Sequence, residues 1–218
     1  MSQPTFVVFN PVVGAFIPRN EKVSAALFYA KSVIGEDEWK TGFRPEKQAQ
    51  VQSLLSEKGV HPVHVSGKIT RVYEDETGDG KGNTYNKVRM FLDDPLEPMM
   101  VSLETKDEVT LIILQQLCNV QNGETITFKP WQERAIRNGR TYYNHRCSLF
   151  REDGSKVPQN TGIWKAAQAE ADAKTAPLRA MNDVSLKKAI NTLAENVKTE
   201  FHLSLLRAEI IPKFTKIV

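Results

Sequence analysis

The chain has 218 residues, 40% of them hydrophobic and 25% charged, which excludes global disorder and is enough for a real core. The formal net charge is only +3, so a site for a polyanion must be a local basic patch. No apolar run reaches the roughly 18–20 residues of a membrane span, and the N-terminus has no signal-peptide pattern. Two cysteines without CxxC spacing indicate buried free thiols, so we expect a cytoplasmic protein, in the host cytoplasm if it is viral.

Residues 1–59 predict an N-terminal extension of short strands and helices. Residues 5–18 alternate between apolar residues and chain breakers, which indicates one or two short strands. Residues 20–34 begin with an Asn cap, and residues 45–58 begin with a proline and end before a glycine. We therefore expect two helices, with an exposed Trp39 in the connection between them.

From residue 61 the apolar residues no longer recur at helical spacing but at every second position, which indicates strands. We expect a bulge near Gly67. Five segments read as strands: 61–76, 85–94, 96–105, 124–131 and 140–152. One helical pattern, at residues 107–120, falls between the third and fourth strands, and turn residues fill 77–83. This order is the OB-fold arrangement, a five-stranded Greek-key barrel with a helix in that position. We therefore predict a mainly β protein with flanking helices (α+β), whose OB-fold barrel spans residues 60–155.

Residues 156–218 predict a linker followed by a C-terminal helix and strand. The segment around Pro158 and Pro177 is rich in alanine and polar residues, part helix and part linker. Residues 183–200 carry apolar side chains at helical spacing, whereas residues 201–218 read as one or two strands. We expect the terminal strands to flank or extend the barrel.

The fifth predicted strand mixes aromatic rings with arginines. Tyr142, Arg146 and Phe150 share one parity, and we interpret them as facing outwards. Tyr143 and Cys147 have the other parity and are expected to face the core. The same mixture recurs on the first two strands, where the outward set is Lys68, Arg71, Tyr73, Lys87, Arg89 and Phe91.

Rings and cations on one face of a barrel are typical of a site for single-stranded nucleic acid, because bases stack on rings and phosphates pair with cations. Residues 125–165 contain eight Lys or Arg against three acids, a local excess greater than that of the whole chain. The expected phosphate contacts are Lys68, Arg71, Lys87, Arg89, Lys129, Arg134, Arg137, Arg140 and Arg146. The expected stacking residues are Tyr73, Phe91, Trp131, Tyr142 and Phe150. The alternative, in which the rings belong to the core and the arginines to a solvated loop, stays open.

Other motifs lack the spacing that their chemistry needs. Residues 75–83 lack the ligand pattern of a calcium loop and are too short for a phosphate loop. His61 and His64 lack the paired spacing of a zinc site, and His145 near Cys147 has no third orienting group. We therefore expect no metal, no cofactor and no enzymatic activity, and a nuclease remains a third class to be tested.

The strand order, with ETITFKPW and NGRTYYNHRCSLFREDG, resembles the OB-fold single-stranded DNA-binding proteins of bacteriophages. The resemblance covers about residues 60–155 and implies a role in DNA replication, recombination or DNA repair. It leaves RNA, self-association into a homo-oligomer and replication proteins open as partners, and no membrane is expected. The acidic tail of many such proteins is missing, since the chain ends in IIPKFTKIV. The alternative is a structural or adaptor protein that uses the same barrel for protein contacts.

Overall fold

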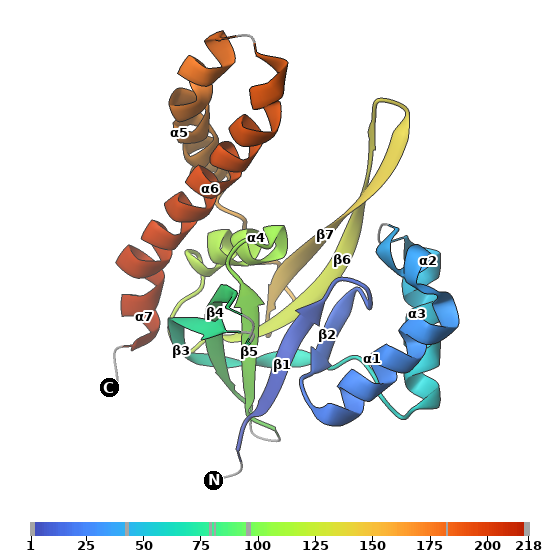
Figure 1. Cartoon of the computed structure of the whole chain (residues 1–218). Helices are drawn as coiled ribbons and strands as arrows, with labels where there is room; N and C mark the ends of the chain where they lie inside the picture. Colours follow the sequence, from blue (N-terminus) through green and yellow to red (C-terminus); the bar gives the residue numbers. More distant parts are fainter. Residues whose placement is uncertain are drawn as a thin grey trace.

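The computed structural model describes residues 3–41, 44–78, 80, 82–94, 97–181 and 183–215. These residues form a mixed α/β structure around a curled seven-stranded sheet with the order β2-β1-β5-β4-β3-β6-β7 (Figure 1). Within the described ranges, no helix combines the length and the apolar character needed to cross a membrane.

The centre of the sheet follows the predicted order of elements. Its antiparallel strands are β3 (Val65–Gly78), β4 (Thr84–Asp93), β5 (Met99–Glu104), β6 (Thr125–Arg137) and β7 (Arg140–Arg151). Helix α4 (Glu108–Leu117) falls between β5 and β6, as predicted. Two residues of the predicted turn between β3 and β4, Asp79 and Lys81, lie outside the described residues.

Two N-terminal strands extend the sheet beyond the five predicted barrel strands. Strand β1 (Thr5–Asn10) pairs in parallel with β5 and antiparallel with β2 (Ala15–Pro18). These two strands are the short N-terminal strands expected from the sequence. Because β1 occupies the outer edge of β5, that edge is paired, and the buried Val7 and Phe16 extend the core. The described residues therefore form one continuous sheet of seven strands.

The irregularity in β3 lies slightly later than predicted. The register with β4 shifts between Ile69 and Arg71, not at Gly67. Gly67 has a φ of 148°, and a Cβ there would lie 3.0 Å from the carbonyl oxygen of Asp93, so a larger residue would collide with β4. The bulge lets Lys68 and Arg71 both point away from the core while Ile69 points into it.

The N-terminal helices pack as a separate layer on β1 and β2 (Figure 1). They are α1 (Glu21–Ile34), α2 (Glu36–Lys40) and α3 (Pro45–Glu57). The predicted Asn20 cap is present, since its side-chain oxygen accepts from the backbone N–H of Val23 at 2.9 Å. The expectation of an exposed Trp39 is wrong: α2 places it half-buried against the cluster that contains Val51 and Leu55.

The C-terminal segment is helical, which corrects the strand prediction. It contains α5 (Thr161–Ala180), a 3-10 turn (Val184–Leu186), α6 (Lys187–Leu205), a π-helical turn (Leu206–Ile210) and α7 (Ile211–Thr215). Residues 216–218 lie outside the described residues. The apolar residues of this end recur at intervals of three or four, and the buried set is Leu203, Leu206, Ile210 and Phe214. That spacing faces one side of a helix, so burial on the core overrides the β-branched character of the end. The segment around Pro177, expected to be part helix and part linker, is helical, because α5 continues through that proline.

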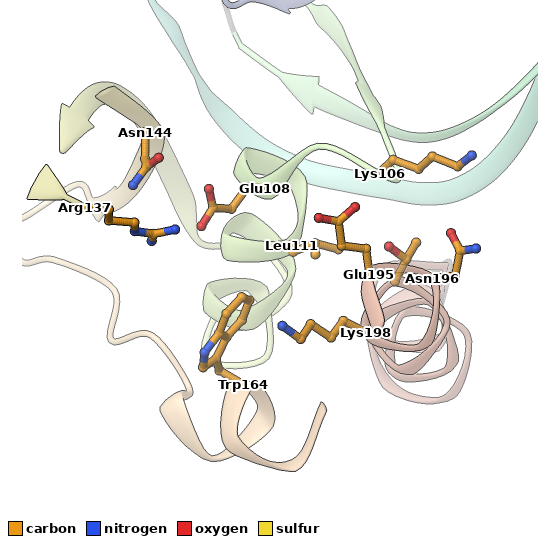
Figure 2. Close-up of a pocket in the computed structure, with 10 residues that line it drawn as sticks. Lys106, Glu108, Leu111, Arg137, Asn144, Trp164, Glu195, Asn196 and Lys198 are labelled. Atoms are coloured by element: carbon orange, nitrogen blue, oxygen red, sulfur yellow. The ribbon is translucent and has the colours of Figure 1, made fainter. Parts of the chain in front are cut away.

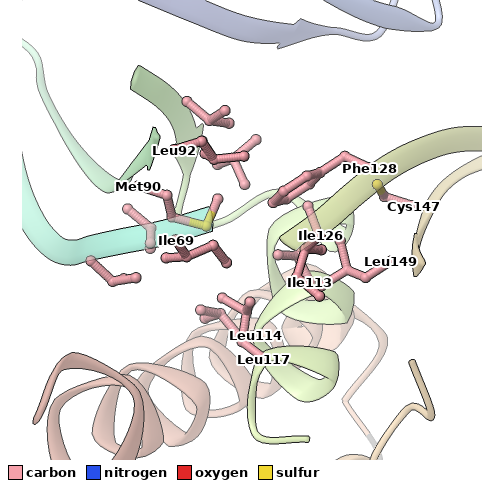
Figure 3. Close-up of a cluster of buried hydrophobic side chains, with 14 of the residues drawn as sticks. Ile69, Met90, Leu92, Ile113, Leu114, Leu117, Ile126, Phe128, Cys147 and Leu149 are labelled. Atoms are coloured by element: carbon pink, nitrogen blue, oxygen red, sulfur yellow. The ribbon is translucent and has the colours of Figure 1, made fainter. Parts of the chain in front are cut away.

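The inner side of the sheet, α4 and the C-terminal helices share one hydrophobic core (Figure 3). Gln116 of α4 fixes β7 to this core: its amide donates to the Cys147 carbonyl and accepts from the Leu149 N–H, each at 2.8 Å. Both cysteines are free, as expected, but only Cys147 is fully buried; Cys118 is half-buried. Burial raises the pKa of the Cys147 thiol to about 12.

Candidate nucleic-acid interface

Strands β6 and β7 extend beyond the sheet as a two-stranded ribbon, which we define as residues 129–148. They pair with each other from end to end, whereas β3 pairs with β6 only as far as Phe128. The ribbon consequently projects from the body of the protein (Figure 1). Asn138 and Gly139 form its tip with φ of 51° and 73°. Two successive residues with positive φ match the right-handed twist of a tight hairpin.

The register gives the ribbon two distinct faces. Directly opposed residues, such as Trp131 with Arg146 and Ala135 with Tyr142, lie on the same face. We call this side, with its continuation at the base, the ring face: its predicted site residues are Lys129, Trp131, Arg137, Arg140, Tyr142, Arg146 and Phe150. Arg134 pairs with Tyr143 on the opposite face, so it is separated from the other predicted contacts.

Burial agrees only in part with the orientations predicted for the side chains of β7, because Ser148, which has the outward parity, is buried. Cys147 and Leu149 are buried on the core side, and Tyr142 is 45% exposed on the ring face. Tyr143, expected to face the core, is only half-buried because it lies beyond the edge of the sheet.

Exposed rings and unpaired cations stand side by side on the ring face. Trp131 is 46% exposed, and its Nε1 donates to Ser148 Oγ at 3.0 Å, which fixes the indole while leaving much of it accessible. Arg137 and Arg140 are exposed, and neither has a carboxylate partner in the part of the chain that is described. The ribbon carries five Lys or Arg against Glu133 alone, which makes it strongly basic.

Arg146 differs from the other cations of the ring face. Its side chain is only 17% exposed, and it contacts Glu108 Oε1 at 2.6 Å and Glu133 Oε2 at 2.7 Å. Two carboxylates therefore already satisfy the charge that the sequence assigned to a phosphate. Phe150, at the base, is half-buried with Lys129 Nζ 4.5 Å from its ring centroid.

A second group of predicted residues lies on the outer side of β3 and β4, which we call the sheet patch. Its members are Lys68, Arg71, Tyr73, Lys87, Arg89 and Phe91. Tyr73 and Phe91 stack with their centroids 6.1 Å apart at 19°, and Arg71 lies 4.8 Å from the Tyr73 centroid. The side chains of the sheet patch therefore face outwards, as their alternation in the sequence predicted.

The cations in the middle of the sheet patch are already paired. Arg89 contacts Asp75 at 2.6 Å, and Lys87 contacts Glu104 at 2.6 Å. Lys68 and Arg71, in contrast, are exposed. The exposed cations therefore lie at one end of the patch.

Two residues of the sheet patch were missed from the sequence. The Arg89 guanidinium lies 5.3 Å, and that of Arg19 5.7 Å, from the centroid of Phe6. Phe6 reaches the patch because β1 pairs in parallel with β5 and places it opposite Met100. No local pattern signals such a pairing between segments more than 90 residues apart.

The opposite face of the ribbon contains His145. Burial and, to a smaller extent, the charge of Arg146 lower the pKa of His145, and its ring lies 5.3 Å from that of Phe9 in an edge-on contact. Among the described side chains, no three His, Cys, Asp or Glu residues converge on a point that could hold a metal ion.

Comparison of the chain with protein-family models, curated proteins and solved structures finds no match. The function must therefore be inferred from the chemistry of the two surfaces themselves. The ring face offers accessible rings with unpaired cations, whereas the sheet patch offers stacked rings whose central cations are neutralised. Of the two, the ring face is better suited to an anionic ligand with planar groups.

Proposed function

We propose that this protein binds single-stranded DNA with little sequence preference, principally on the ring face. The observation that carries the proposal is the shared face of Trp131, Tyr142, Arg137 and Arg140, all of them exposed. Tyr142 lies opposite Ala135, four residues along the ribbon from Trp131, or about 13 Å at the rise of a strand. Two rings at that separation can each stack a different base while the arginines contact the phosphates between and beyond them.

The order of the strands and of α4 supports the proposal that this surface belongs to an OB-type fold. In our proposal β3, β4, β5, β6 and β7 are the five OB strands, and α4 is the helix between the third and fourth. The ribbon is then the hairpin between the fourth and fifth strands, and the sheet patch lies on the first and second strands. In OB folds this hairpin and the face of the second and third strands bind oligonucleotides. Strand β1, on the outer edge of β5, is an addition to that plan.

Single strands fit the ring face better than duplexes do. Stacking on Trp131 and Tyr142 needs bases whose planar faces are accessible, and a duplex hides those faces between neighbouring base pairs. Because every base has such a face, binding tolerates any sequence. We propose protection of unwound DNA during replication, recombination or repair as the role, without a catalytic step.

A protein-binding role is the second candidate, and exposed apolar side chains favour it. Phe28 on α1 is 76% exposed and Val33 on the same helix is 51% exposed. Both belong to α1 and not to the ribbon, so a protein contact there is compatible with nucleic-acid binding on the ring face. The two roles differ in their response to salt, because phosphate contacts weaken steeply as salt rises and apolar contacts do not.

The test is anisotropy of fluorescein-labelled oligo-dT, oligo-U and a mixed-sequence duplex at two salt concentrations. We expect micromolar or tighter binding to the single strands, much weaker binding to the duplex, and a marked loss of affinity at the higher salt. Equal affinity for duplex and single strand would contradict the stacking surface. Cleavage of the oligonucleotide in the presence of Mg²⁺ or Mn²⁺ would contradict the absence of a catalytic step.

A further inference from the structure

A cleft of about 390 Å³ separates the ribbon from the helices α5 and α6 (Figure 2). Helix α4 lies at its base and contributes Glu108. Arg137 and Asn144 line the ribbon side, whereas Trp164 of α5 and Lys198 of α6 line the opposite side. Because Arg137 and Asn144 both belong to the ring face, that face looks into the cleft.

The helical wall repeats the chemistry of the ring face. Trp164 is half-buried, and Lys198 Nζ lies 5.4 Å from its ring centroid. Neither residue was predicted from the sequence as a ligand contact, because both fall in the C-terminal segment outside the predicted barrel. The fold brings this ring and cation opposite the ribbon.

A buried polar network lies next to Trp164. Its ring centroid lies 6.3 Å from that of His202, which is fully buried. His202 Nδ1 donates to the Lys198 carbonyl at 2.7 Å, so its Nε2 accepts from the Gln115 amide at 2.8 Å. The network ties α6 to α4, and Trp164 itself lines the cleft.

The charge of the cleft favours an anion. Its cations are Lys106, Arg137 and Lys198, and its acids are Glu108 and Glu195. Glu108 is already paired with Arg146, so its negative charge is offset within the protein.

We infer that a single strand bound on the ring face continues into this cleft, where Trp164 stacks a base and Lys198 contacts a phosphate. The inference rests on the proposed function and adds a second wall to the site, formed by α5 and α6. A second copy of the chain is a poorer occupant, because its ribbon is itself strongly basic and would meet the basic residues of the cleft.

The first test uses Trp164 as its own probe. The chain has three tryptophans, so the double variant Trp39→Phe/Trp131→Phe leaves Trp164 as the only emitter. Unlabelled oligo-dT should quench this emission and shield the indole from acrylamide. Anisotropy of labelled oligo-dT on the same variant shows independently whether DNA is bound. Bound DNA without any change in the emission or the shielding of Trp164 would overturn the inference and leave the proposed function standing.

The second test compares matched lysines. Lys198→Gln should weaken binding of oligo-dT by about fivefold or more and reduce the salt slope by about 0.7, the value for one phosphate contact of a single strand. Lys165→Gln removes an exposed lysine of α5 that does not line the cleft, and should leave both quantities unchanged. Equal effects of the two variants would overturn the inference.

A third variant, and the outcomes that would contradict the inference or the proposed function, complete the tests. Trp164→Leu should weaken binding about five- to 150-fold, the range for one stacked base. If this variant fails to fold, the inference is still tested by comparing Lys198→Gln with Lys165→Gln and by the emission of the protein that retains only Trp164. No binding of labelled oligo-dT by the wild-type chain would overturn the proposed function and the inference together. A dimer that dissociates on Lys198→Gln would instead assign the cleft to a second copy.

Discussion

The guanidinium of Arg146 lies 2.6 Å from the carboxylate of Glu108, and this ion pair joins the base of the ribbon to the first turn of α4. The sequence assigned Arg146 to a phosphate, but the contact gives it a positioning role. Glu133 lies on the ribbon itself, so Glu108 is the partner that connects Arg146 to α4, and Glu108 also lines the cleft. A ligand phosphate would have to displace a carboxylate to reach it.

We therefore expect Arg146 and Glu108 to be coupled energetically. Arg146→Gln, Glu108→Gln and the double variant should form a cycle with a coupling free energy of about 0.5–1 kcal/mol in the free energy of unfolding. Urea denaturation of the four proteins measures it. Strict additivity of the two single changes would show that the ion pair contributes nothing to holding the ribbon.

The two sides of β7 should respond differently to truncation. Tyr142→Ala removes an exposed ring of the ring face and should lose about 1–3 kcal/mol of binding to oligo-dT with little change in the melting temperature. Leu149→Ala removes a fully buried side chain and should lose about 2–5 kcal/mol of stability. Tyr143→Ala should fall between them in stability because that ring is half-buried. A thermal melt and an oligo-dT titration of each variant test this, and early melting of Tyr142→Ala would contradict the facing.

The arginines near the ribbon tip allow phosphate contact to be tested with a matched control, because they lie on both faces of the ribbon. Arg137→Ala and Arg140→Ala should each flatten the dependence of log affinity on log salt by about 0.7, because one phosphate contact is lost. Arg134→Ala should leave the slope unchanged, since this exposed arginine lies on the opposite face. Oligo-dT titrations at four salt concentrations compare the three variants. An equal change for Arg134→Ala would mean that charge density alone, and not the ring face, binds the strand.

The free energy of unfolding should decrease in mild acid, because the buried His202 becomes protonated more readily in the unfolded chain. Burial lowers the pKa of His202, and the hydrogen bond to the Lys198 carbonyl offsets this only in part. The folded chain therefore resists protonation more than the unfolded chain does. The stabilisation is complete above the unfolded pKa of about 6.5 and is lost as the pH falls through the lower folded pKa.

Urea unfolding between pH 8 and pH 5 measures this loss. His202→Gln should flatten the pH dependence, while His61→Gln, at an exposed position, should keep it. Part of the dependence should survive in His202→Gln because the pKa of His145 is also lowered. A wild-type protein whose stability does not change over this range would contradict the buried network.

Local patterns in the sequence determined the elements around the site. A period of two places alternate side chains of a strand on opposite faces whatever else the chain does, so the outward facing of Tyr142 and Arg89 follows from parity. The Asn138-Gly139 turn needs positive φ at both residues, which these residue types tolerate best, and it thereby fixes the register of the ribbon. The order of β3, β4, β5, α4, β6 and β7 could be read in the same way.

Only the tertiary structure decided which of those side chains are free to contact a ligand and which are occupied by contacts from distant parts of the chain. Arg146 and Glu108 are 38 residues apart in the chain, and Arg207, which pairs with Glu74, is 133 residues from its partner. Such contacts depend on how the sheet curls and how helices dock on it, and hydrophobic periodicity carries no information about either. The same reason explains the end of the chain. Leu206, Ile210 and Phe214 suit a strand or a helix by residue type; their spacing of four places them on one face of a helix, and the core beside α4 buries that face.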